Sequence, residues 1–232
     1  MSEKEIFQKA KEEIYFQVNA TDEEISQRAF EEIKAQKHTL PNKIFEYKNR
    51  DKRFIFMAGS PGVGKREIAK SLKQKYKIDC IDTDDIEILC RGYSGKNSHL
   101  YQKAGIKGAD MLAKYAFSKD YSFILNGDFI DSNLLKHIIK KATKCDYDIE
   151  IAYVYRPLEV AKRYTKTIEK RYGKRVSDET FIKNSLDAIE TVLRFIGKIR
   201  VKFYDLTDCK IIENMSKEHF LEIVKNDLKW LS

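Results

Sequence analysis

The stretch that decides the fold is Phe54-Ile55-Phe56-Met57-Ala58-Gly59-Ser60-Pro61-Gly62-Val63-Gly64-Lys65-Arg66. An apolar run enters a glycine-rich loop that ends in lysine, and a helical pattern follows it. The motif G-x-x-x-x-G-K-[ST] wraps polyphosphate with backbone N–H groups at a helix N-terminus, and its lysine reaches the outer phosphates. The predicted nucleotide-binding residues are therefore Gly59, Ser60, Pro61, Gly62, Val63, Gly64, Lys65 and Arg66.

The last position of this loop departs from the motif. Ser or Thr normally follows the lysine, because the hydroxyl group ligates Mg²⁺. The residue here is Arg66, which has five donors and no acceptor and would place a cation beside the metal. The loop therefore predicts nucleotide binding and puts catalysis in question.

The composition predicts a folded protein of the cytoplasm. The chain has 232 residues, 42% of them hydrophobic, which suffices for one large domain or one domain with an extension. No run approaches the roughly 18 apolar residues of a membrane span, and the N-terminus lacks the apolar core of a secretory signal. Four cysteines and four histidines are scattered, so neither a disulfide framework nor a zinc site is indicated. The net charge of +8 comes from basic residues spread along the chain, which argues against a dedicated nucleic-acid surface.

Two units are predicted along the chain. Residues 1–50 read as a helical extension of two helices. The first carries an apolar stripe of Ile6, Ala10 and Ile14, and in the second Thr21 and Glu24 form a capping box ahead of the stripe Ile25, Ala29 and Ile33. We expect both stripes to pack on the main domain. Residues 51–232 alternate short β-rich runs with helical patterns, as crossover units on a parallel sheet do. We predict a three-layer α/β phosphate-loop NTPase fold with a mostly parallel central sheet. Its predicted strands are 53–58, 78–82, 121–126, 149–155 and 201–206, and its predicted helices are 65–76, 98–118, 132–144, 157–172, 178–197 and 216–230.

Ligands of such sheets gather outside the carboxyl ends of the strands. Ile81-Asp82-Thr83-Asp84-Asp85 follows the second strand. Phosphoryl transfer needs a carboxylate that takes a proton from the acceptor hydroxyl, and often another that holds Mg²⁺. The alternative is a capped helix start, with Asp82 or Thr83 as N-cap.

Three further segments follow predicted strands or lie near them. Asn126-Gly127-Asp128 ends the third strand; Asn126 cannot act as a base, and Asp128 is either its substitute or part of a simple turn. Residues 156–175 form a basic helix and loop, which is either a lid that brings Arg171 or Arg175 into the site or a solvated face. Residues 91–102 form either a small-molecule pocket or a loop with a helix cap.

Together these residues resemble the bacterial zeta toxin family, which comprises phosphate-loop kinases that phosphorylate UDP-N-acetylhexosamines. The similarity covers residues 53–206. It rests on A-G-S-P-G-x-G-K at 58–65, Ile81-Asp82-x-Asp84, Tyr93-x-Gly95-x-Asn97 with Gln102, I-L-x-G at 124–127, and Tyr153-Val154-Tyr155.

The resemblance implies ATP and Mg²⁺ as cofactors, a nucleotide-sugar substrate and a small antitoxin protein that blocks the ATP site. It implies that Lys65 binds ATP phosphates, that Asp84 is the catalytic base, and that Arg171 with Arg175 or Lys174 supplies the lid cations. The implied substrate-binding residues are Asp82, Tyr93, Asn97 and Asp128, and Asp82 is also the implied metal ligand.

The chain departs from the family pattern at several positions, each bearing on metal binding or phosphate charge. Arg66 replaces the hydroxyl residue, Asn126-Gly127-Asp128 replaces D/E-G-T, Glu87 replaces an arginine, and Ile168 and Lys174 occupy two possible lid positions. Three hypotheses follow: an active kinase, a catalytically impaired pseudo-kinase that binds nucleotide or a protein partner, and a kinase of nucleic-acid ends. The active kinase ranks first, because the loop, the Asp element and the sugar segment survive together.

Overall fold

A six-stranded sheet forms the centre of the protein, whose computed structural model describes residues 3–127 and 132–231. The strand order is β2-β3-β1-β4-β5-β6; β1 to β5 are parallel and β6 is antiparallel to β5. The strands are β1 (Arg53–Ala58), β2 (Asp79–Asp82), β3 (Phe123–Asn126), β4 (Asp148–Tyr155), β5 (Arg200–Asp205) and β6 (Lys210–Ile212).

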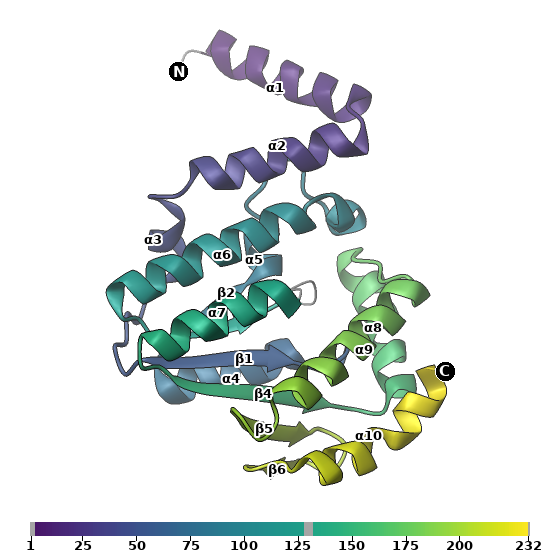
Figure 1. Cartoon of the computed structure of the whole chain (residues 1–232). Coiled ribbons are helices and arrows are strands. Elements are labelled where there is room, and N and C mark those ends of the chain that lie inside the picture. The colour runs from purple at the N-terminus through teal and green to yellow at the C-terminus, as the bar shows by residue number, and fades with distance from the viewer. Residues whose placement is uncertain (1–2, 128–131, 232) are drawn as a thin grey trace.

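Helices cover both faces of this sheet (Figure 1). They are α1 (Glu3–Asn19), α2 (Asp22–Ala35), α3 (Leu40–Ile44), α4 (Lys65–Tyr76), α5 (Thr83–Glu87), η1 (Gly95–Leu100), α6 (Gln102–Lys119), α7 (Ser132–Lys144), α8 (Leu158–Tyr172), α9 (Asp178–Phe195) and α10 (Lys217–Leu231). Alternate residues of β1 enter opposite cores: Phe54 packs with α6 and α7, whereas Ile55 packs with α4 and α8. The apolar run of β1 is therefore continuous because both of its faces are buried.

The predicted three-layer α/β fold is confirmed, and each of the five predicted strands is present to within two residues. The sequence did not predict β6, which has three residues and a burial pattern too short to show alternation. The predicted helix 98–118 is divided into η1 and α6. In the described residues, every helix is too short or too polar to span a lipid bilayer.

The two N-terminal helices differ in how much of their apolar side is buried. The predicted capping box of Thr21 and Glu24 begins α2, whose Ile25 and Ile33 are buried in the main core. The expectation that the first stripe also packs on the domain is wrong, because Ile6 and Ile14 of α1 are 54% and 65% exposed. Amphipathic spacing shows which side of a helix is apolar, but not whether another element covers it.

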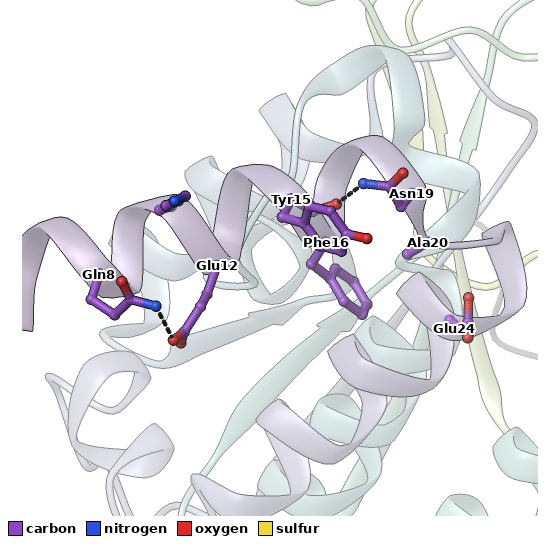
Figure 2. Close-up of a pocket in the computed structure, with 8 residues that line it drawn as sticks. Gln8, Glu12, Tyr15, Phe16, Asn19, Ala20 and Glu24 are labelled. Atoms are coloured by element: carbon purple, nitrogen blue, oxygen red, sulfur yellow. Dashed lines mark hydrogen bonds between the residues drawn. The ribbon is translucent and has the colours of Figure 1, made fainter.

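A groove separates α1 from the start of α2, at the top of the molecule and away from the phosphate loop (Figures 1 and 2). Polar side chains that line it form hydrogen bonds within α1: Gln8 donates to Glu12 at 2.9 Å, and Asn19 donates to the Tyr15 carbonyl at 2.7 Å. Phe16 of α1 packs against the core, and its ring centroid lies 3.9 Å from the Arg28 guanidinium carbon.

Asp79, the first residue of β2, fixes the segment that joins the N-terminal helices to the sheet. Its buried carboxylate accepts backbone hydrogen bonds from Glu46 at 3.0 Å, Tyr47 at 3.0 Å and Lys48 at 3.1 Å. Buried polar groups are costly when their partners are removed. Asp79 thus joins the extension to the strand that carries the acidic segment.

We expect Asp79→Ala to lower the free energy of unfolding by about 2–4 kcal/mol, because three backbone N–H groups lose their shared buried acceptor. Urea denaturation followed by circular dichroism measures this change. The control is Asp187→Ala, an exposed position on α9 where the change should stay within about 0.5 kcal/mol. A loss below about 1 kcal/mol for Asp79→Ala would contradict the anchoring role.

Candidate functional site

The phosphate loop lies between the end of β1 and the start of α4. Gly59 and Gly64 have φ angles of 135° and 104°, which side chains rarely allow. A Cβ at Gly59 would lie 2.4 Å from the Val154 carbonyl oxygen, and one at Gly62 would lie 2.4 Å from that of Ala161. Only glycine lets the loop pass this close to β4 and α8.

Lys65, at the first position of α4, is buried within this loop. Its Nζ donates hydrogen bonds to the carbonyl oxygens of Gly59 at 2.8 Å and Ser60 at 2.9 Å. Arg156, which follows β4, adds a bond from Nε to the Val63 carbonyl at 3.1 Å. A helix N-terminus, a lysine and a braced loop form an arrangement that can hold an anion such as a phosphate group.

Asp82 ends β2 beside Asn126, which ends the neighbouring strand β3. Asn126 Nδ2 donates to Asp82 Oδ2 at 2.8 Å, and Asp82 Oδ1 accepts the backbone N–H of Asp84 at 3.0 Å. The second bond caps α5, so the helix-cap interpretation is confirmed. Burial raises the pKa of Asp82 to about 6; Asp84 adds to the effect, while Arg66 and Asn126 oppose it.

Arg66 reaches from the first turn of α4 toward this acidic segment. Its guanidinium group contacts the Asp85 carboxylate, and its Nε lies 3.8 Å from Asp82 Oδ2. Burial opposes the charge on Arg66, but the carboxylates of Asp82, Asp85 and Asp84 raise its pKa. The side chain therefore stays a cation at the position from which a hydroxyl group would ligate Mg²⁺.

These residues do not fit the Mg²⁺ site of an ordinary phosphate loop. The ligating hydroxyl is missing, and a guanidinium group pairs with Asp85 and lies near Asp82, the implied metal ligand. Across residues 3–127 and 132–231, no set of three or more His, Cys, Asp or Glu side chains is placed to hold a metal ion. Mg²⁺ prefers near-octahedral oxygen coordination, which a neighbouring cation opposes.

Lys174, just after α8, contacts the acidic segment. Its Nζ lies 2.5 Å from Asp84 Oδ1, and its side chain is only 13% exposed. Arg171 and Arg175 are both exposed; the first lies over the Tyr172 ring, and the second is 3.9 Å from Glu169. Of the lid cations that the sequence suggested, Lys174 is the one that the fold brings to Asp84.

Residues 93–97 lie next to the end of α8. A Cβ at Gly95 would lie 1.8 Å from the Tyr172 carbonyl oxygen, so this segment packs directly on the end of α8. Burial raises the pKa of Tyr93, with Glu87 adding to the effect and Lys174 opposing it, which places the phenol near the same charges.

Asn97 uses its amide within its own loop. It accepts from the Ser94 N–H at 2.7 Å and donates to the Gly92 carbonyl at 2.9 Å, as the helix-cap interpretation expects. Glu87 is fully buried on α5 against Gly105. Asp128 lies outside the described residues. Asp85 belongs to the predicted acidic motif, but its contact with Arg66 was not predicted; its place beside Asp84 was the signal that could have identified it.

We expect Asp82→Asn to raise the free energy of unfolding at about pH 7.5 by roughly 1–3 kcal/mol. The raised pKa means that Asp82 favours the fold below about pH 4, and that this contribution is lost as the pH rises to about 6. Asparagine can keep the cap without the buried charge. Denaturant titrations at about pH 4.5 and 7.5 should show the gain in stability mainly at the higher pH. The control Asp187→Asn should leave the stability unchanged at both pH values. If Asp82→Asn were less stable than the native chain at both pH values, the raised pKa of Asp82 would be contradicted.

Gly95→Ala should separate residues 93–97 from the end of α8, because the new methyl group cannot fit against the Tyr172 carbonyl. Hydrogen–deuterium exchange should become faster in both segments, by about tenfold for amides that lose a contact worth about 1.4 kcal/mol. His99→Ala, an exposed change in the same 3₁₀ turn, is the control. Unchanged exchange around residue 172 would show that the two segments are not coupled.

Comparisons with known proteins agree with this architecture. No curated protein sequence matches the chain. Among solved structures, a chain from the study of the PezAT toxin–antitoxin system of Streptococcus pneumoniae superposes with a TM-score of 0.63 at 16% identity, covering 89% of this chain and 97% of its own. A chain of the AvrRxo1-ORF1:AvrRxo1-ORF2 complex, solved with ATP, gives a TM-score of 0.57 at 13% identity, covering 88% and 70%. The zeta toxin family model matches residues 37–224, and the chain therefore belongs to the zeta toxin family.

Proposed function

We propose that the protein is a kinase that transfers the γ-phosphate of ATP to a sugar hydroxyl of UDP-N-acetylglucosamine or a related nucleotide sugar. The observation that carries this proposal is the convergence of three parts at one edge of the sheet. The phosphate loop is linked to the acidic segment by the Arg66–Asp85 contact, Lys174 pairs with Asp84, and Gly95 packs against the end of α8 just before Lys174. Family membership supports the same class of reaction.

Each part has a role that its chemistry suits. The loop N–H groups and Lys65 would hold the ATP phosphates. Asp84 would take the proton of the attacking sugar hydroxyl, which requires Lys174 to give way or to share the carboxylate with the acceptor. Lys174, with Arg171 and Arg175 on a closing lid, would neutralise charge on the transferred group. Tyr93 and Asn97 would shape the acceptor pocket, with Asn97 acting through the loop it braces.

The alternative function is nucleotide or protein binding without turnover. The pairing of Arg66 with Asp85, and the presence of Asn126 where a carboxylate is expected, favour it. Losing one electrostatic contributor to a transition state typically costs on the order of 10²-fold or more in rate, and several losses together could abolish turnover. The two functions share the same loop and differ only in the chemical step.

A partner protein is also part of the proposal. One similar structure comes from a toxin–antitoxin system, and another comes from a two-component complex. We propose that a small antitoxin protein covers the ATP site of this chain.

Mass spectrometry of UDP-N-acetylglucosamine incubated with the protein and ATP tests the kinase, with Mg²⁺ and with EDTA. A phosphorylated nucleotide sugar from the native chain, reduced about 10²-fold or more in Asp84→Asn, is the expected result. Asp187→Asn is the matched control. Product from Arg66→Thr alone would indicate a kinase disabled at the loop, whereas no product from any variant would favour the binding function; phosphorylation of an oligonucleotide end instead would contradict the substrate class.

A further inference from the structure

Arg66 brings a fixed positive charge to the place where phosphate-loop proteins position a metal ion. It is the second residue of α4 and directly follows the lysine of the loop. Its guanidinium group leans toward α5 and contacts Asp85, with Asp82 at 3.8 Å. In the usual motif the same carboxylate-bearing edge holds Mg²⁺ or its water ligands.

The acidic segment already has basic partners. Asp82 and Asp85 face Arg66, and Asp84 pairs with Lys174 at 2.5 Å. A divalent cation would have to displace the guanidinium group from Asp82 and Asp85. It would also have to shed part of its own hydration shell, which Mg²⁺ does reluctantly. The affinity of the acidic segment for a divalent cation is therefore lower than that of unpaired carboxylates.

A guanidinium group can also bind the phosphate oxygens that a metal ion would otherwise bind. It carries five N–H donors in a planar fork that matches phosphate oxygens in pairs, and its charge persists at any physiological pH. The Arg66 side chain remains 43% exposed, so its carboxylate contacts leave part of it accessible. Lys65, one residue earlier, is anchored to the carbonyl oxygens of the loop.

We propose that Arg66 takes the place of the divalent cation, so that this loop binds a nucleoside triphosphate without Mg²⁺. The inference rests on the nucleotide binding within the proposed function, but not on catalytic turnover. It assigns Arg66 as the residue that makes nucleotide binding independent of Mg²⁺.

Isothermal titration calorimetry with ATP, in excess EDTA and in excess MgCl₂, tests the proposal. For the native protein the dissociation constants in the two buffers should agree to within about threefold. Arg66→Thr restores the hydroxyl group and removes the cation, so its binding in EDTA should weaken by about tenfold or more, and Mg²⁺ should recover most of the loss. Arg200→Thr is the matched control, because Arg200 also pairs with two carboxylates, Asp148 and Glu150, where β4 and β5 begin.

The outcomes separate the inference from the proposed function. Binding by the native chain that tightens about tenfold or more with Mg²⁺ would overturn the inference and leave nucleotide binding intact. An Arg66→Thr variant that binds ATP in EDTA as tightly as the native chain would also overturn it. Absence of ATP binding in both buffers, with circular dichroism showing a folded protein, would overturn both.

Discussion

The parallel direction of β1 to β4 is the constraint on which the rest of the molecule depends. Because these strands run the same way, their carboxyl ends meet at one edge of the sheet, and the loops that follow them become neighbours. Glycines then allow the phosphate loop to lie against the backbone of β4 and α8, closer than any side chain would permit. The positions of Lys65, Asp82, Asn126 and Arg156 follow from this edge and from the two cores that fix the sheet from either side.

The unusual residues of the site are coupled to one another. Asn126 donates its amide hydrogen to Asp82, which would be impossible for the carboxylate expected at that strand end. Two carboxylates in such contact would repel each other unless a metal ion or a proton lay between them. With Arg66 beside Asp82 and an amide opposite it, the buried acid is supported without either. The substitutions therefore form a consistent set, in which each makes the others tolerable.

The sequence was sufficient for most of the fold, because buried parallel strands are continuous apolar runs and the helices between them are amphipathic. It failed at β6, where three residues carry no periodic signal, and at α1, whose apolar side is exposed. The phosphate loop and the acidic segment were identified by residue type and spacing. The contacts of Arg66 with Asp85 and of Lys174 with Asp84 could not be predicted, because they join segments 19 and 90 residues apart through long flexible side chains.

The close packing of Gly95 on the Tyr172 carbonyl has a consequence for how the site can move. Residues 93–97 pack directly against the end of α8, and Lys174, two residues beyond that helix, pairs with Asp84. In the proposed reaction Lys174 releases or shares the Asp84 carboxylate, and a release that shifts the end of α8 would also move the residues around Tyr93. Access to the proposed base and the shape of the segment around Tyr93 would then change together instead of independently.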